Sequence, residues 1–113
     1  MFQVYLVAGG RTTNEDGSEG VKLDSTELFI GGKWVPVGPL PVAVTGVRGV
    51  TLDNTVLMAG GFGSGGSGKM NDIWIYNYVT NTWYTSPVSM QEGRSGHGAS
   101  VVPFYRYFYD YYL

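Results

Sequence analysis

Short runs of apolar and β-branched residues, separated by glycines and polar turns, make up most of this chain. Residues 55–59, TVLMA, form an apolar run that ends in a double glycine, which is typical of a strand buried on both faces. Residues 71–77, NDIWIYN, are rich in β-branched and aromatic side chains and show neither helical spacing nor a capping box. Residues 81–86, NTWYTS, follow a polar turn, and residues 96–102, GHGASVV, offer a fourth strand. The pattern predicts strands throughout and no helix.

The same landmarks return along the chain with a period near 50 residues. Residues 4–10, VYLVAGG, return as 55–61, TVLMAGG, a shift of 51, and residues 25–29, STELF, return as 72–76, DIWIY, a shift of 47. Further landmarks keep the same order, namely Trp34 with Trp83, Leu40 with Met90, and residues 45–52 with 95–102. A unit of about four antiparallel strands in ~50 residues is typical of a β-propeller blade.

The residues at these landmarks resemble kelch repeats over roughly residues 4–104. The motifs are the double glycine after an apolar strand, the segment YNYVTNTW at 76–83, and MQEGRSGHGAS at 90–100. The first copy departs from the pattern, with Phe in place of Tyr and a hairpin two residues shorter, in which Gly31-Gly32 suits a tight turn. The resemblance implies an all-β fold of antiparallel four-stranded kelch blades. The repeat positions are Gly9, Gly10, Phe29, Trp34, Gly60, Gly61, Tyr76 and Trp83.

The repeat divides the chain into two blades and the start of a third. Residues 1–41 are expected to form a blade that lacks its opening strand, residues 42–91 a complete blade, and residues 92–113 the start of another. Propellers close with roughly 4–8 blades, so this propeller is predicted to be incomplete. The chain is therefore expected to be a fragment of a longer protein or to assemble with others. The aromatic tail YRYFYDYYL at 105–113 is either a divergent strand or a truncated end.

Composition narrows the class of protein further. The 113 residues are 43% hydrophobic and 14% charged, as expected for one small globular unit. The net charge of −2 gives no general attraction to nucleic acid or to an anionic membrane, and no run of about 20 apolar residues could span a bilayer. The absence of Cys excludes disulfides and cysteine-based metal sites or nucleophiles. We expect a cytoplasmic protein.

The glycine-rich stretch at 61–70, GFGSGGSGKM, resembles two nucleotide-binding motifs. Residues 63–69 read G-x-x-x-x-G-K, and residues 63–68 read G-x-G-x-x-G. However, Met70 stands where a P-loop needs Ser or Thr, and a strand is predicted where both motifs need a helix to hold the phosphate. We therefore expect a connection between two strands and no bound nucleotide. The first copy of this loop, at 11–24, has unrelated chemistry, which indicates surface variation.

Catalytic and metal-binding alternatives have little support in the residues. His97 is the only histidine, and no nucleophile elbow surrounds Ser95 or Ser100. The carboxylates of Asp24, Asp53 and Asp72 stand beside predicted turns, where Asp caps the backbone. We therefore predict no catalytic residue, no metal and no cofactor.

The resemblance implies a non-catalytic module that binds a protein or peptide. In kelch propellers the loops on one face form a shallow pocket, and the matching positions here are Arg11, Thr13, Thr45, Phe62, Ser64 and Ser95. Arg11 is the strongest candidate, because a guanidinium suits acidic peptide side chains. Many kelch proteins join a BTB domain to a cullin ubiquitin ligase; others bind actin. Some kelch-like propellers are oxidases, whose copper ligands of Tyr, His and Cys are not all available here.

Overall fold

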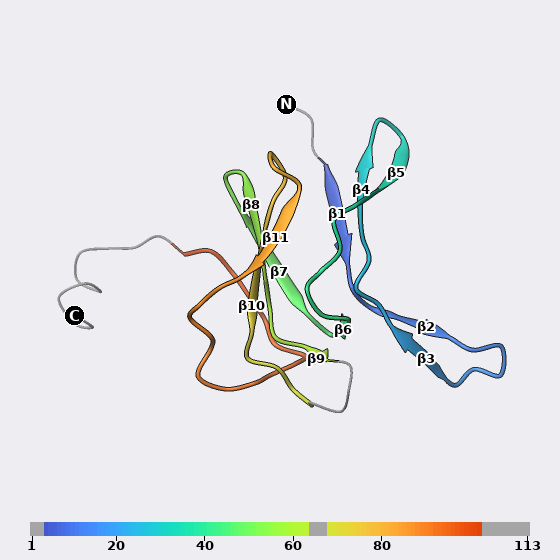
Figure 1. Cartoon of the computed structure of the whole chain (residues 1–113). Helices are drawn as coiled ribbons and strands as arrows, with labels where there is room; N and C mark the ends of the chain where they lie inside the picture. The colour runs from blue at the N-terminus through green and yellow to red at the C-terminus, as the bar shows by residue number, and fades with distance from the viewer. Residues whose placement is uncertain (1–3, 64–67, 103–113) are drawn as a thin grey trace.

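The computed structural model describes residues 4–63 and 68–102, and these residues form β-strands, turns and loops (Figure 1). No helix occurs among the described residues, as the pattern of apolar positions predicted. Nothing in the described ranges could therefore cross a membrane as a helix. Two larger sheets and two short two-stranded ladders account for the strands.

The first sheet has three antiparallel strands in the order β1-β4-β5. Strand β1 spans Tyr5–Ala8, β4 spans Thr26–Ile30 and β5 spans Lys33–Val37. Gly31 and Gly32 connect β4 to β5 with φ of 58° and 80°, so the predicted tight turn is confirmed. Strand β1 lies at one edge of this sheet.

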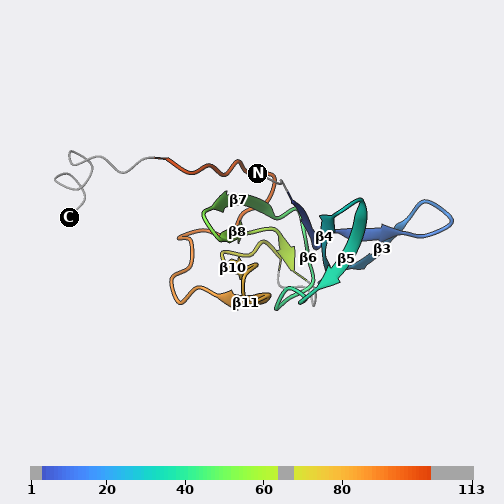
Figure 2. The ribbon, with the colours of Figure 1, turned by 90° about the horizontal axis from the view of Figure 1, so that it is seen from above.

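The second sheet has four antiparallel strands in the order β11-β10-β8-β7, the sheet expected of a propeller blade (Figure 2). Strand β7 spans Arg48–Leu52, β8 Thr55–Ala59, β10 Ile73–Asn77 and β11 Thr82–Thr85. Each strand pairs with its neighbours in the sequence, so the sheet is a simple meander. The glycine-rich stretch connects β8 to β10, the second and third strands, as predicted.

The two short ladders lie at the end of the sheets where the double glycines follow β1 and β8. We call this the glycine end (Figure 1). Strands β2, Arg11–Thr13, and β3, Glu19–Lys22, form a hairpin that projects from the first sheet. The sequence was interpreted as a plain loop here, because its polar residues carry no strand pattern. Strands β6, Val44–Thr45, and β9, Phe62–Gly63, join the two repeats.

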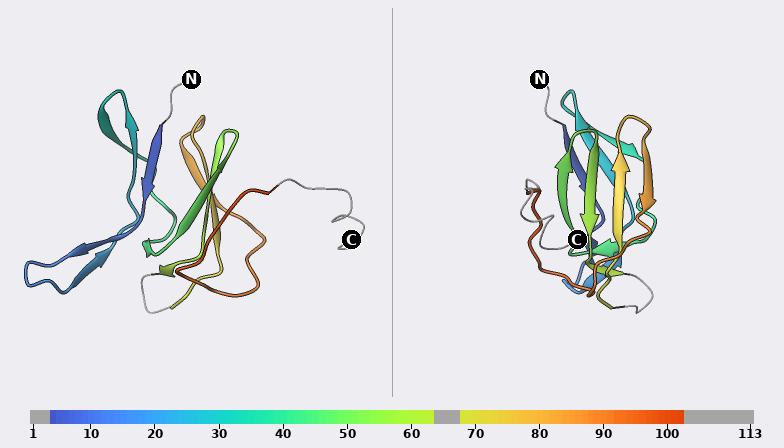
Figure 3. Two further views of the ribbon diagram at one scale, coloured as in Figure 1. Left: turned by 180° about the vertical axis from the view of Figure 1, so that it is seen from behind. Right: turned by 90° about the vertical axis from the view of Figure 1, so that its left-hand side faces the viewer.

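The hydrophobic core lies between the two sheets, which stack face to face (Figure 3). Trp74 and Met58 of the second sheet are buried together with Leu40 and Val44 of the connecting segment. Leu6 of β1 packs against this cluster from the first sheet. Because side chains alternate between the faces of a strand, each sheet gives one face to this core and leaves the other face outside.

A shared set of backbone hydrogen bonds shows that the two repeats have the same frame. The Gly10 amide donates to the Val44 carbonyl at 2.8 Å, and 51 positions on, the Gly61 amide donates to the Arg94 carbonyl at 2.8 Å. Four more bonds recur in the same way, donor before acceptor: Gly9–Ser25 and Gly60–Asp72, Leu23–Gly10 and Met70–Gly61, Leu40–Asp24 and Met90–Asn71, Val44–Leu23 and Arg94–Met70. The spacings match the shifts of the sequence landmarks, so the repeat is a repeat of backbone structure.

The first glycine of each pair is required by close backbone approach. Gly9 has φ of 72°, and a Cβ there would lie 2.6 Å from the Val44 carbonyl oxygen. Gly60 has φ of 76°, and a Cβ there would collide with the Arg94 carbonyl oxygen. Both the left-handed conformation and the missing side chain are needed at these two positions.

Residues 91–102 depart from the expected pattern, because they contain no strand. Their sequence matches the segment that forms β6 and β7 one repeat earlier, and the hydrogen bonds at Arg94 match those at Val44. A strand needs a neighbouring strand to pair with, and no strand in the described part of the chain pairs with these residues. The described part of the chain is thus an incomplete propeller. Its two larger sheets stack as two neighbouring blades and do not make a closed ring of blades. The boundaries placed at residues 41 and 91 stay predictions.

Candidate functional site

Four of the predicted partner-binding residues lie at the glycine end. Arg11 begins β2 directly after Gly10, and Thr45 of β6 pairs with Phe62 of β9. The Ser95 Cβ lies 3.7 Å from the place a Cβ would take at Gly46, next to Thr45. Phe62 is 37% exposed, so an aromatic side chain is accessible in this group. These four positions form what we call the candidate binding surface.

Arg11 is held by an ion pair within its own hairpin. Its Nη1 contacts Oε1 of Glu19, a residue of β3. The two side chains are 46% and 74% exposed, so water and salt screen the pair and its contribution is about 0–1 kcal/mol. A carboxylate on a partner could therefore replace Glu19 at little cost.

The other two predicted residues contribute less to this surface. Thr13 lies at the outer end of β2, where it pairs with Glu19, and its side chain is exposed. It extends the same hairpin away from the sheets. Ser64 lies outside the described residues.

Lys22 belongs to the candidate binding surface although the sequence did not single it out. It pairs with Arg11 across the hairpin, and its Nζ donates to the Gly63 carbonyl at 2.7 Å. This bond joins the hairpin of the first repeat to β9 of the second and fixes Arg11 relative to Phe62. No local signal could have found it, because it depends on how the repeats stack.

The aromatic repeat positions form equivalent pairs in both sheets. The rings of Phe29 and Trp34 have centroids 5.0 Å apart, and those of Tyr76 and Trp83 are also 5.0 Å apart. Their environments differ, because Trp83 packs against the core and Trp34 is 51% exposed. Within the described residues, Trp83 therefore fills space beside the core, whereas Trp34 does not.

Asn81 is a second residue that the sequence did not indicate. It has a positive φ of 54° in the turn between β10 and β11, and its Oδ1 accepts from the Tyr76 hydroxyl at 2.7 Å and from the Gly38 amide at 3.1 Å. These bonds tie the outer hairpin of the second sheet to the end of the first. Burial raises the pKa of the Tyr76 hydroxyl. Phe29 has no hydroxyl, so the first sheet lacks this connection.

The glycine-rich stretch has the geometry of a turn on both sides of residues 64–67. The Gly63 amide donates to the Gly68 carbonyl at 3.3 Å, and Lys69 forms an isolated bridge with Phe62. The chain then enters β10 instead of a helix, as predicted. Lys69 therefore does not precede a helix N-terminus, the element on which phosphate-binding loops rely.

His97 is half-buried at the glycine end. Its carbonyl accepts from Arg48 Nε at 2.9 Å, and its ring packs against Gly60. Neither ring nitrogen has a hydrogen-bond partner among the described residues. In those same residues, no three His, Cys, Asp or Glu side chains gather in a group that could hold a metal ion.

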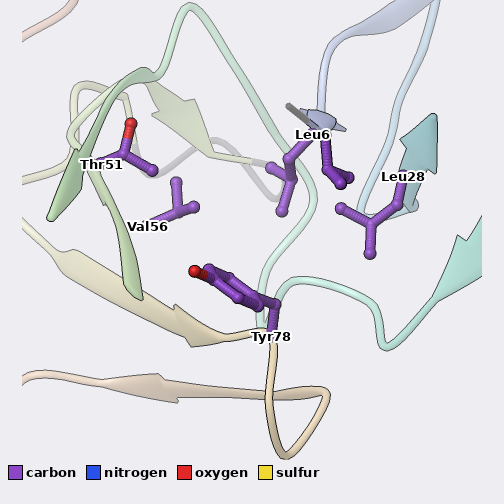
Figure 4. Close-up of a pocket in the computed structure, with 6 residues that line it drawn as sticks. Leu6, Leu28, Thr51, Val56 and Tyr78 are labelled. Carbon is purple, nitrogen blue, oxygen red and sulfur yellow. The ribbon is translucent and has the colours of Figure 1, made fainter. Parts of the chain in front are cut away.

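A cavity of about 220 Å³ lies between the sheets at the opposite end from the double glycines (Figure 4). Leu6 and Leu28 line it from the first sheet, and Thr51 and Val56 line it from the second. The Tyr78 hydroxyl, at its margin, donates to the Asp53 carbonyl at 3.0 Å. The walls are mainly apolar and contain none of the predicted binding residues, so the cavity is separate from the candidate binding surface.

Comparison with known proteins supports the kelch assignment. A family model described as the Kelch motif matches residues 43–87, which include all four strands of the second sheet. Among solved structures, the chain is similar to YjhT, with a TM-score of 0.59 and 22% identity. The match covers 66% of this chain and 24% of YjhT, so the chain spans about a quarter of that protein, and a likeness at this identity shows the fold alone. No curated protein matches the chain.

Proposed function

Since residues 43–87 of this chain match the Kelch motif, we propose that the chain is a non-catalytic module that binds a protein or peptide at its glycine end. The supporting observation is the candidate binding surface, where Arg11, Thr45, Phe62 and Ser95 from both repeats lie at one end of the sheets. The frame beneath them is fixed by backbone hydrogen bonds between repeats. Binding residues placed on loops above a rigid frame are a common arrangement in interaction modules.

The chemistry of the surface favours a peptide that carries acidic side chains. Arg11 presents a guanidinium whose only ion pair in the described structure is the exposed one with Glu19. A carboxylate from a partner can take the place of Glu19, and the guanidinium fork allows a bidentate contact with it. Phe62 of β9, next to the Gly63 carbonyl that accepts from Lys22, offers an apolar contact for a neighbouring side chain. The proposed ligand therefore combines a carboxylate with an adjacent apolar residue.

Binding of short peptides to the whole chain tests this function. The probe is an array of peptides of equal length that differ in the number of Asp and Glu residues. We expect acidic peptides to bind more tightly than neutral ones, and Arg11→Glu to weaken that binding about tenfold or more. Lys33→Glu is the matched control, because Lys33 is exposed at the start of β5, away from the glycine end. Equal losses in the two variants, or no preference for acidic peptides, would count against the proposal.

A more specific role follows from the kelch resemblance. We propose substrate recognition for a BTB–kelch adaptor of a cullin ubiquitin ligase, with the BTB domain contributed by a longer parent protein. Recovery of a cullin with the full-length parent in a pull-down supports this role, and its repeated absence contradicts it. Binding of actin is the alternative, which co-sedimentation with filaments distinguishes.

A further inference from the structure

The outer face of the first sheet carries exposed apolar side chains. Tyr5 and Val7 of β1 are 60% and 51% exposed on it. Their equivalents one repeat later are Val56 and Met58, which pack into the core between the sheets. The first sheet therefore presents outward part of the apolar surface that the second sheet buries, although the exposed Glu27 stands on this face where the second sheet has the buried Trp74.

The outer face of the second sheet is the complementary surface. Leu57 lies on it, and its equivalent one repeat earlier is Leu6, which packs against the core from the first sheet. The outer face also carries an apolar row across all four strands, in the order Val50, Leu57, Ile75 and Tyr84. Tyr84 is 50% exposed. Each of the two outer faces thus carries apolar side chains equivalent to ones that pack between the two sheets.

The edge of β1 and the segment 98–102 are a second complementary pair. Within the described residues β1 pairs on one side only, with β4, whereas its equivalent β8 pairs with both β10 and β7. The counterpart of β7 in the next repeat is residues 98–102, 50 positions later. That segment forms no strand, and its Val101 and Val102 are 46% and 72% exposed. Among the described residues, one edge of β1 has no partner strand and residues 98–102 have none either.

We propose that copies of this chain associate head to tail. The outer face of the second sheet of one copy packs on the outer face of the first sheet of the next, and residues 98–102 of the first copy pair with β1 of the second. This contact uses the same strand arrangement as the internal interface between the two sheets, with Glu27 in the place that Trp74 takes there. Because its two halves differ, the contact is heterologous and gives a ring if the rotation closes.

Analytical ultracentrifugation of the whole chain over a range of concentrations tests the proposal. We expect the parent to form oligomers of defined mass. Val7→Lys places a charge on the outer face of the first sheet, and Tyr84→Lys places one on the outer face of the second, so each variant alone is expected to stay monomeric. Val79→Lys is the control, because Val79 is 69% exposed in the turn between β10 and β11 and lies in neither sheet. It should associate like the parent.

Mixing the two interface variants distinguishes this arrangement from a symmetric dimer or from aggregation. Val7→Lys keeps an intact second sheet, and Tyr84→Lys keeps an intact first sheet. An equimolar mixture is therefore expected to form a dimer with one copy of each variant and nothing larger. Circular dichroism of each variant, matched to the parent, shows that a loss of association is not a loss of fold.

A variant in the segment 98–102 tests the strand pairing by itself. Ser100→Pro removes a backbone N–H without adding charge, so it should raise the concentration needed for association about tenfold. A parent that stays monomeric at every concentration would overturn the proposal. So would association of Val7→Lys equal to that of the parent, or a mixture of the two variants that contains only monomers.

Discussion

The two stacked sheets share one backbone frame but place equivalent side chains in opposite environments. At equivalent positions, Trp74 of the second sheet is fully buried and Glu27 of the first is exposed. The hydrogen bonds around the double glycines are nevertheless the same in both repeats. The frame is therefore set by glycines and by backbone bonds that recur from one repeat to the next, whereas burial depends on whether another sheet lies against the face.

This difference assigns stability and association to separate parts of the molecule. The second sheet has a buried tryptophan, a fourth strand and the hydroxyl bond of Tyr76 to Asn81. In the described residues, the first sheet has three strands, an aromatic pair in which Trp34 is exposed, and an edge strand, β1, that pairs on one side only. We expect the second sheet to determine the free energy of unfolding and the first sheet to provide a surface for other molecules.

The largest expected effect is a difference in the free energy of unfolding between equivalent positions of the two sheets. Trp74→Ala should lower the free energy of unfolding by about 3–5 kcal/mol, because it leaves a large cavity in the core. Glu27→Ala should change it by less than about 0.5 kcal/mol, because Glu27 is exposed. Urea unfolding followed by far-ultraviolet circular dichroism measures both. Similar losses would mean that the buried face has been assigned to the wrong sheet.

If Trp74→Ala does not fold, Trp74→Phe makes the same comparison. The Trp74 indole N–H has no hydrogen-bond partner among the described residues, so Phe loses packing volume without leaving an acceptor unpaired. We expect a smaller loss than for Ala, still larger than that for Glu27→Ala.

The next effect compares the two aromatic pairs. Trp83→Ala should cost about 2–4 kcal/mol, less than a fully buried tryptophan because its side chain is only partly covered. Trp34→Ala should cost less than about 1 kcal/mol in dilute protein, since Trp34 packs mainly on Phe29. Thermal melting at low concentration measures both without a contribution from association. Equal melting temperatures for the two variants would contradict the difference in burial.

The smallest effect concerns the hydroxyl that the second sheet has and the first lacks. Tyr76→Phe gives the second sheet the residue type of Phe29 and should cost about 1 kcal/mol at neutral pH, because the hydrogen bond to Asn81 is lost. Burial raises the pKa of Tyr76 in the folded state, so the folded state favours the neutral hydroxyl.

The pH dependence of stability follows from the raised pKa of Tyr76 in the folded state. Above the unfolded pKa of about 10 the unfolded chain ionises first, so the stability of the parent falls as pH rises from there through the raised folded pKa. In Tyr76→Phe this decline should be weaker. Unfolding free energies measured on both sides of pH 10 test it, and parallel pH profiles for parent and variant would show that Tyr76 does not cause the decline.

The strands and their order followed from the sequence because they depend on local signals. The double glycines, the apolar runs and the repeat shifts placed β1, β4, β8 and β10 and the turn at Gly31. The hairpin of β2 and β3 was missed because its residues are polar and its strands pair only with each other. The bonds of Lys22 to Gly63 and of Asn81 to Gly38 join the two repeats, so no local pattern could have indicated them.

Amide hydrogen exchange in dilute protein, read residue by residue by NMR, tests the contrast between the sheets most directly. The account predicts that amides in β8 and β10, the central strands of the second sheet, exchange slowest and report the free energy of global unfolding. Amides in β1 and β5, at the edges of the first sheet, should exchange faster although the backbone frame is the same. Equal protection in the two sheets, or slower exchange in β1 than in β8, would contradict the account.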